Sequence, residues 1–208
     1  MELIQQSVEI LDPISPGGME ELKKLERIGR ACYRSESYIS EDGESAKRFV
    51  RMLIKSGHES VLEHISITVL FVTDRGITHE LVRHRHCAFT QESTRYCAYA
   101  DEKKFPNGVP MIEFGLNAPE VYTALSDAEY YYQQLIKKGY KPEEARMVLP
   151  NATAAKLYMT ANLREWRSVL KLRLGRGAHP QMRSLMGMLL DEFQSKLPVV
   201  FGDISHEG

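Results

Sequence analysis

"HISITVLFVT", residues 64–73, is the run of sequence that decides the fold. Its residues are mostly β-branched, aromatic or aliphatic, which are the types that favour β-strands. Six of the ten positions are apolar, four of them in succession from Val69 to Val72, which makes the run too apolar for a strand with one solvent-exposed face. We therefore expect a strand in a sheet that is buried between layers.

Two further stretches are typical of strands. "ELIQQSVEILD", residues 2–12, predicts an opening strand that ends at the prolines and glycines of "PISPGG". "ATAAKLYMTAN", residues 152–162, favours a strand over a helix because Tyr158, Met159 and Thr160 are grouped in it. The polar "DEKKFPNGVP", residues 101–110, is expected to be an exposed turn region.

Helical periodicity covers much of the remaining chain. Longer helices are predicted over "MEELKKLERIGRACY" (19–33), "SEDGESAKRFVRMLIKSG" (40–57), "APEVYTALSDAEYYYQQLIKKGY" (118–140), "LREWRSVLKLRLG" (163–175) and "PQMRSLMGMLLDEFQSKL" (180–197). In the second of these, Phe49, Met52 and Leu53 are expected on the packed face. Short helices are predicted after Asp74 and before Pro150, and the C-terminal tail is expected to be irregular.

The elements together predict an α+β fold. We expect a buried, mainly antiparallel sheet flanked by several long helices, in a single domain over residues 1–208. A chain of 208 residues, 43% of them hydrophobic, is long enough to bury a substantial core.

The charge balance bears on possible partners. Lys and Arg number 27 and Asp and Glu number 28, so the net charge of -1 supplies no global field that would recruit nucleic acid or an acidic membrane. No run of about 18 apolar residues could span a bilayer. We expect no nucleic-acid partner, no membrane and a cytoplasmic location.

The three cysteines, Cys32, Cys87 and Cys97, are odd in number and form no CxxC pair. This pattern argues against a disulfide framework and against a structural zinc site. None has a neighbouring sequence that would activate its thiol, so we interpret them as free cysteines of the core in a reducing compartment. This holds most for Cys32, which continues the apolar stripe of its predicted helix.

"RHRHCAFTQESTRY", residues 83–96, is the first candidate site. Guanidinium groups form forked hydrogen bonds to phosphate, and Gln, Ser and Thr can read the edge of a heterocycle. This mixture indicates a nucleotide. There is no glycine-rich loop, so side chains would have to hold the phosphates. A solvated basic surface is the alternative.

Two other polar segments have alternative explanations. "GHESVLEH" contains His58, Glu59, Glu63 and His64, which could bind a metal, but a helix end with solvated polar groups explains them better, and we predict no metal. In "NLREWRSVLKLRLGR", the charges spaced three and four apart include Arg167, which we expect to be solvated.

"RHRHCAFTQESTRY" resembles the signature of the flavin-dependent thymidylate synthases, in which Arg-His-Arg is followed at fixed distances by Ser, Asn, Ser and Arg. Arg83, His84, Arg85, Ser93 and Arg95 match it, whereas Ala88 and Thr90 replace the first Ser and the Asn. Three more blocks are similar to the family's and occur in its order: "GHESVLEH", "ARMVLP" and "NLREWRSVLKLR".

The resemblance implies an enzyme that converts dUMP to dTMP. Methylenetetrahydrofolate would donate the carbon, FAD would carry the hydride and NADPH would be the reductant. Members of the family are homotetramers whose active sites are shared between subunits, which makes the folate, the nucleotide and further copies of the chain the expected partners.

The resemblance also implies roles for single residues. The expected cofactor-binding residues are His64, Ser66, Arg83, His84, Arg85, Gln91, Asn162, Leu163, Arg164 and Ser168. The expected substrate-binding residues are Glu80, Leu81, Val82, Arg83, Gln91, Glu92, Ser93, Thr94, Arg95, Arg146 and Arg173. Glu80, Ser168 and Gly177 differ from the residues that are common at these positions in the family.

Arg173 is the expected catalytic residue. Uracil C5 is a poor nucleophile, and a guanidinium near N3 and O4 would favour the enolate-like form that attacks an iminium carbon. No enzyme nucleophile is then required.

Two hypotheses from other classes stay open at this point. One is an RNA-binding surface in which Phe89, Tyr96 and Trp166 stack on bases. The other is a metallohydrolase built from His58, His64, His79, His84 and His86.

Overall fold

The computed structural model describes residues 1–113, 115 and 118–206. The chain divides into two compact units, each considered by itself below. Unit 1 comprises Met1–Ser7, Leu70–Arg83 and Phe89–Tyr158. Unit 2 comprises Val8–Val69, His84–Ala88 and the chain from Met159 to the C-terminal end.

The larger sheet confirms the expected α+β fold. In the described part of the chain its strands β2 (Ser7–Ile10), β3 (Ser66–Asp74), β6 (Ala154–Asn162) and β4 (Ala88–Gln91) are hydrogen-bonded in the order β2-β3-β6-β4. Beyond one end of the β3–β6 pair, Arg75 N donates to Thr153 O (3.2 Å), and beyond the other Leu163 N donates to Ile65 O (2.9 Å). Because the residue numbers of β3 rise as those of its partners in β6 fall, the two strands are antiparallel.

A second, two-stranded sheet corrects the prediction for the N-terminus. Strand β1 (Glu2–Ile4) pairs in parallel with β5 (Pro110–Ile112). The single opening strand expected over residues 2–12 is therefore two strands that belong to different sheets. The two non-strand residues between them, Gln5 and Gln6, separate the pairings.

Strand β3 is less uniformly buried than its composition predicts. Ile67, Val69, Phe71 and Thr73 are buried, but the alternating positions from Thr68 to Asp74 are only half-buried and Ser66 is exposed. One face of the strand therefore packs in the interior, and the other is covered in part.

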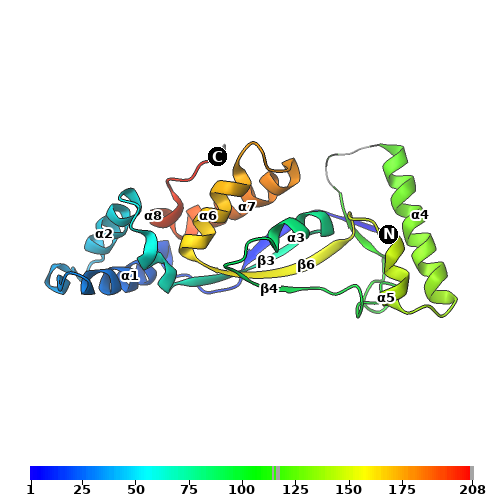
Figure 1. Cartoon of the computed structure of the whole chain (residues 1–208), viewed down its shortest axis with the longest axis horizontal. Helices are drawn as coiled ribbons and strands as arrows, with labels where there is room; N and C mark the ends of the chain where they lie inside the picture. Colours follow the sequence, from blue (N-terminus) through cyan, green and yellow to red (C-terminus); the bar gives the residue numbers. More distant parts are fainter. Residues whose placement is uncertain (114, 116–117, 207–208) are drawn as a thin grey trace. The chain divides into compact units, whose positions relative to one another are not determined.

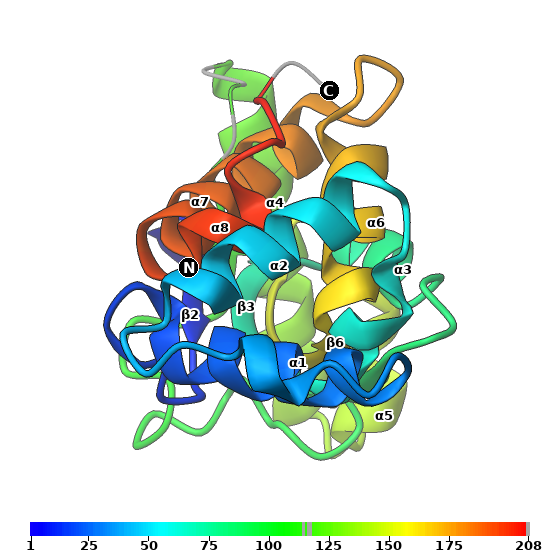
Figure 2. The same ribbon diagram turned by 90° about the vertical axis from the view of Figure 1, so that its left-hand side faces the viewer.

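Unit 2 holds the helices that form its core (Figure 2). They are α1 (Met19–Ala31), α2 (Glu44–Lys55), α6 (Leu163–Leu174), α7 (Pro180–Lys196) and α8 (Pro198–Phe201). Helix α1 packs on α2, α6 on α7 and α7 on α8. Trp166, Phe193 and Phe201 are fully buried, and the rings of Phe193 and Phe201 stack with centroids 4.4 Å apart.

Two predictions for unit 2 need correction. The packed face of α2 consists of Ala46, Val50 and Leu53, whereas Met52 is 47% exposed. The tail expected to be irregular begins with the short helix α8, whose Val200 and Phe201 are buried. In α2 the buried residues Ala46, Val50 and Leu53 are spaced four and three apart, which places them on one face of the helix.

Unit 1 contains α3 (Arg75–Leu81), α4 (Pro119–Lys137) and α5 (Pro142–Ala145). As predicted, the side chain of Asp74 caps α3 by accepting a hydrogen bond from Ile77 N (2.8 Å). The core of this unit contains a cluster of buried residues that includes Tyr99, Val109 and Tyr132. Tyr132 belongs to α4, and Val109 lies near the end of residues 101–110, the segment expected to be an exposed turn region.

Short 3-10 turns complete the described structure in each unit. They cover Pro16–Gly18, Glu36–Tyr38, Glu59–His64 and Arg146–Val148. Figure 1 follows the order of the elements along the chain by colour. Within the described residues, none of the helices is long and apolar enough to cross a membrane.

Candidate functional site

A polar pocket of about 480 Å³ opens on unit 2 at the start of α6. It is lined by Glu63, His86, Asn162, Arg164, Glu165 and Ser168. The start of the helix is fixed by Asn162, whose Oδ1 accepts a hydrogen bond from Glu165 N (2.8 Å). Because this bond uses the amide oxygen, the amide NH₂ of Asn162 is the group that can donate to a ligand.

Arg164 and Ser168 lie one helical turn apart at this pocket. Arg164 Nη1 forms an ion pair with Glu63 Oε1 (2.5 Å), and the hydrogen bond from Arg164 to Glu63 raises the pKa of this exposed guanidinium. Ser168 Oγ donates to the carbonyl oxygen of Arg164 (3.3 Å). The pocket thus presents a permanent cation, an amide and a hydroxyl, with carboxylates beside them.

His84 and Arg173 form a second group in unit 2. Arg173 Nε donates to His84 Nε2 at 2.9 Å. His84 Nδ1 lies 3.9 Å from Oε1 of Glu165, a residue that also lines the pocket. Burial, and then the positive charge of Arg173, lower the pKa of His84 below its usual 6.5. His84 is therefore a neutral imidazole at neutral pH.

The lowered pKa of His84 makes stability depend on pH. The unfolded chain takes up a proton near its ordinary pKa of 6.5, and the folded chain does so only at lower pH. This contribution is complete above the unfolded-state pKa and is lost as the pH falls towards the folded-state value. We expect urea unfolding to show a larger loss of unfolding free energy between about pH 7.5 and about pH 5.5 for the wild type than for His84→Gln. Equal losses would contradict the assignment.

A separate polar group lies in unit 1 along β4 and the turn after it. Gln91 Nε2 donates to Thr78 Oγ1 (2.8 Å), so the amide oxygen of Gln91 is the group that can accept from a ligand. Ser93 begins the turn, and its carbonyl oxygen accepts from the backbone N–H groups of Tyr96 and Cys97. The sequence motif "QESTRY" therefore holds its polar side chains on a fixed turn.

Two arginines flank this turn. Arg146 Nη1 donates to Thr94 Oγ1 (3.2 Å), and Arg95 Nη2 lies 3.3 Å from Glu143 Oε2. Both arginines are exposed, so an anion can compete with these contacts at little cost. By contrast, Glu92 Oε1 accepts from the hydroxyl of buried Tyr99 (3.1 Å), which gives Glu92 a structural role within unit 1.

The predicted site residues are thus distributed over two groups. Unit 2 brings together His84, Asn162, Arg164, Ser168 and Arg173, and unit 1 brings together Gln91, Glu92, Ser93, Thr94, Arg95 and Arg146. Among the other candidates, His64, Ser66, Val82, Arg83 and Arg85 are exposed, Glu80 is half-buried, and Leu81 and Leu163 are fully buried. A ligand could reach the last two through backbone groups alone.

Arg167 was predicted to be solvated, and this is wrong. Its side chain is only 1% exposed. Nη1 and Nη2 form a forked pair with Asp203 (2.6 and 2.7 Å), Nη1 also donates to Val200 O, and Nε lies 3.2 Å from Glu59 Oε1. The sequence did carry a signal: Arg167 continues the apolar stripe of Leu163, Leu170 and Leu174 at helical spacing.

Cys87 is poorly suited to nucleophilic chemistry. Burial, and then the charge of Glu165, raise the pKa of its thiol to about 12, so almost no thiolate exists at neutral pH. Cys32 is exposed. We expect iodoacetamide to modify Cys32 in the native protein, and Cys87 only after denaturation, as read by peptide mass spectrometry. Equal labelling rates would show that Cys87 is activated.

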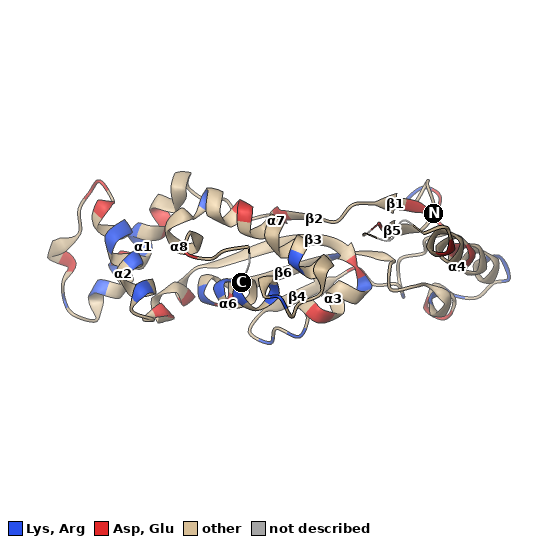
Figure 3. Ribbon diagram, turned by 90° about the horizontal axis from the view of Figure 1, so that it is seen from above, with Lys and Arg blue, Asp and Glu red and all other residues tan. Residues whose placement is uncertain are grey.

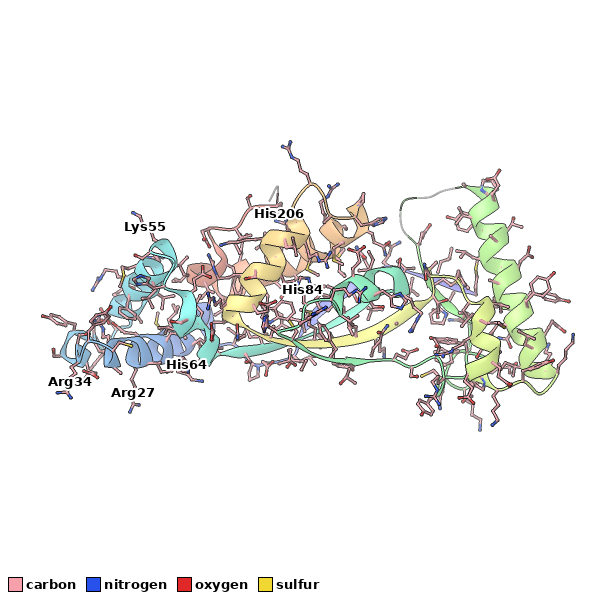
Figure 4. The ribbon with its side chains drawn as sticks, in the orientation of Figure 1. Arg27, Arg34, Lys55, His64, His84 and His206 are labelled. Atoms are coloured by element: carbon pink, nitrogen blue, oxygen red, sulfur yellow. The ribbon has the colours of Figure 1, made fainter. Side chains whose placement is uncertain are left out.

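A metal site built from histidines was one of the alternative hypotheses from the sequence. In residues 1–113, 115 and 118–206 there is no group of three His, Cys, Asp or Glu side chains placed to hold a metal ion. One ring nitrogen of His84, Nε2, instead accepts a hydrogen bond from Arg173. The side chains of His64 and His84 are labelled in Figure 4.

Most of the chain matches a known protein family. Residues 18–199 match the family model described as Thy1, "Thymidylate synthase complementing protein". The chain belongs to this family. The match runs through both units, so the family region is not confined to either of them.

Curated relatives carry the name flavin-dependent thymidylate synthase. The protein from Mycobacterium sp. (strain JLS) is 34% identical over 201 residues, covering 86% of this chain and 78% of its own length. That from Corynebacterium efficiens is 30% identical over 203 residues, covering 88% and 79%. That from Mycobacterium tuberculosis is 32% identical over 197 residues, covering 86% and 78%.

A solved structure shares the fold of this family member. It is the UMP/dUMP methylase PolB from Streptomyces cacaoi bound with 5-Br dUMP. The TM-score is 0.79 at 24% identity, with 97% of this chain and 96% of the other covered.

Proposed function

We propose that this chain is a flavin-dependent thymidylate synthase that reductively methylates dUMP to dTMP. Methylenetetrahydrofolate is the carbon donor in this proposal, and NADPH reduces a bound FAD. The observation that carries it is the neutral His84 bound to Arg173 beside a polar pocket, in a chain whose relatives at 30–34% identity bear this name. The motif departures at Ala88 and Thr90 lie outside that group.

The pocket residues of unit 2 fit a flavin. Asn162 offers an amide NH₂, Ser168 a hydroxyl, and Arg164 a permanent positive charge that suits a pyrophosphate. Glu63 already pairs with Arg164, and this salt bridge is exposed, so a phosphate can exchange with the carboxylate. When bound, FAD would supply hydride transfer between the reductant and the transferred carbon.

The unit 1 group fits a nucleoside monophosphate. Arg95 and Arg146 are exposed cations beside the turn that begins at Ser93, and two guanidinium groups can both donate to one phosphate. The Gln91 amide oxygen can accept from a base N–H, and Ser93 can bond to the sugar or phosphate. In this proposal these residues bind dUMP.

Arg173 supplies the electrostatic part of the reaction. Its guanidinium would stabilise negative charge on the O4 and N3 edge of uracil, which increases the nucleophilic character of C5. The protein then needs no attacking side chain, in agreement with the raised pKa of Cys87.

Assembly and location are part of the same proposal. We infer one catalytic domain that contains both units, because a single family match runs through them. In a homotetramer with shared sites, the nucleotide group of one subunit and the flavin group of another could serve one reaction. The location in this proposal is cytoplasmic.

The visible spectrum of the purified protein tests the flavin assignment. We expect absorbance bands of bound FAD, after reconstitution if necessary, and anaerobic bleaching by NADPH at a rate that dUMP changes. UMP in place of dUMP measures how strictly the site requires the deoxyribose. A protein that stays colourless with excess FAD, and whose RNA binding falls steeply with salt, would replace this proposal with the RNA-binding hypothesis.

A further inference from the structure

A hydrogen bond from a defined atom, Nε, helps to orient the side chain of Arg173. Its Nε donates to His84 Nε2 over 2.9 Å. Nε lies in the plane of the guanidinium group, so this bond fixes the direction in which that plane faces. An unrestrained arginine side chain loses rotamer entropy when a ligand orders it. Here part of that ordering precedes ligand binding.

The direction of this hydrogen bond fixes the state of His84. Arginine only donates, so Nε2 must carry the lone pair, and the proton of the neutral ring is on Nδ1. Nδ1 faces Glu165 at 3.9 Å, a distance that gives electrostatic orientation rather than a direct hydrogen bond. The ring is only 9% exposed, and burial lowers its pKa, which keeps Nε2 unprotonated.

His84 thereby contacts two parts of one helix. Glu165 lies in the first turn of α6, where its backbone N–H is bound by the cap Asn162, and Arg173 lies in the last turn. These two positions are about 12 Å apart along the axis at 1.5 Å per residue. The ring of His84 comes from outside the helix, from the segment His84–Ala88 of unit 2. Any shift of this segment along α6 would change both contacts together.

We propose that His84 is a positioning residue for Arg173: its neutral Nε2, oriented by Glu165 through Nδ1–H, sets the guanidinium plane that meets the carbonyl edge of a pyrimidine nucleotide. This inference rests on the proposed function and deepens it. It differs from the cofactor-binding role that the resemblance implies for His84, because the ring here acts through Arg173. Within the described part of the chain, Arg173 and Glu165 are the charged groups with a contact to the ring, and both belong to α6.

Two variants separate positioning from packing. In His84→Gln, the amide oxygen can take the place of Nε2 and accept from Arg173. In His84→Leu, the volume is kept and the acceptor is lost. We expect His84→Leu to lower kcat about 10- to 100-fold, by analogy with the loss of a group that orients a metal ligand, with the Kd for dUMP changed less than about threefold. His84→Gln should recover about tenfold of that loss.

The matched control is the variant His206→Gln. His206 pairs with Asp191 in unit 2 and has no role in the proposed site. We expect its kcat and its Kd for dUMP to equal those of the wild type. Circular dichroism and the visible flavin spectrum, recorded for every variant, show whether fold and cofactor are retained.

A measurement independent of turnover tests the contact itself. Nitrogen-15 NMR of the wild type should show His84 with an unprotonated Nε2 and a protected Arg173 Nε–H signal. That arginine signal should persist in His84→Gln and broaden by exchange with water in His84→Leu.

A protonated Nε2 at neutral pH would overturn the proposal. Equal losses of turnover in Gln and Leu, accompanied by loss of flavin, would also overturn it and leave His84 as a cofactor residue. A wild type that does not methylate dUMP defeats the proposed function and the nucleotide part of this inference with it. The NMR signals decide the His84–Arg173 contact in either case.

Discussion

Replacement of Arg173 by alanine should lower the turnover of dUMP by about 10³-fold, the loss typical when a preorganised donor to a developing negative charge is removed. The charge develops on uracil as C5 attacks, so the loss should appear mainly in kcat. The affinity for dUMP should change by less than about tenfold, because Arg95 and Arg146 supply the phosphate contacts in the proposal. Steady-state kinetics and calorimetric titration of dUMP measure the two quantities.

Arg173→Lys is the matched control for charge. Lysine keeps the positive charge but lacks the Nε that donates to His84 and the planar fork. We expect its turnover to lie between those of the wild type and the alanine variant. If Arg173→Ala binds dUMP normally and turns it over at nearly the wild-type rate, Arg173 has no electrostatic role in the reaction.

Replacement of Arg167 by methionine should have the second-largest effect, on stability. The side chain of Arg167 is 1% exposed, and its loss leaves Glu59, Asp203 and Val200 O without their partner. Breaking a buried pair in this way costs about 3 kcal/mol, at the low end of the range because the side chain of Asp203 is 49% exposed and can be hydrated. Urea unfolding followed by circular dichroism measures the loss.

The control for this prediction breaks an exposed pair. In Lys196→Met the lost partner is Glu192, and the side chains are 44% and 49% exposed, so the cost should be below about 0.5 kcal/mol. The hydrogen bond from Arg167 also lowers the pKa of Asp203. Its stabilisation is therefore present above the ordinary pKa of 3.8 and is lost as the pH falls below it. Equal stabilities of Arg167→Met and Lys196→Met would contradict the account of this cluster.

Local sequence signals predicted most of the helices and the central strand. The Asp74 cap, the proline at the start of α4 and the apolar run of β3 act over a few residues, so the pattern alone is informative. The division of residues 2–12 into two strands could not be predicted this way. The pairing of β1 with β5 joins residues more than 100 positions apart, and no local pattern encodes it.

The charge of a side chain was the least reliable sequence signal for predicting whether that side chain is buried. An arginine on a mixed helix is usually solvated, and Arg167 departs from this rule because Asp203, 36 residues later, and Glu59 reach it. The exposed pairs, such as Arg164 with Glu63, follow the rule. Figure 3 marks the lysines and arginines along α6 and α2, but colour by charge alone does not distinguish the buried cation from its solvated neighbours.

The site residues became recognisable through motif order rather than through local chemistry. "RHRHCAFTQESTRY" indicated a nucleotide, but nothing in the sequence near His84 pointed to Arg173, which is 89 residues away. The structure adds that bond and the cap that fixes the start of α6. These two hydrogen bonds define which atoms of the candidate residues donate and which accept.

Formation of dTMP by the purified protein is the most direct measurement. The reaction would contain dUMP, deuterium-labelled methylenetetrahydrofolate, NADPH and FAD, with the nucleotide product identified by mass spectrometry. We expect dTMP that carries the labelled carbon, no product when dUMP, methylenetetrahydrofolate or NADPH is omitted, and about 10³-fold slower formation of dTMP by Arg173→Ala. Binding of dUMP and FAD without any methylated product would contradict the proposed activity.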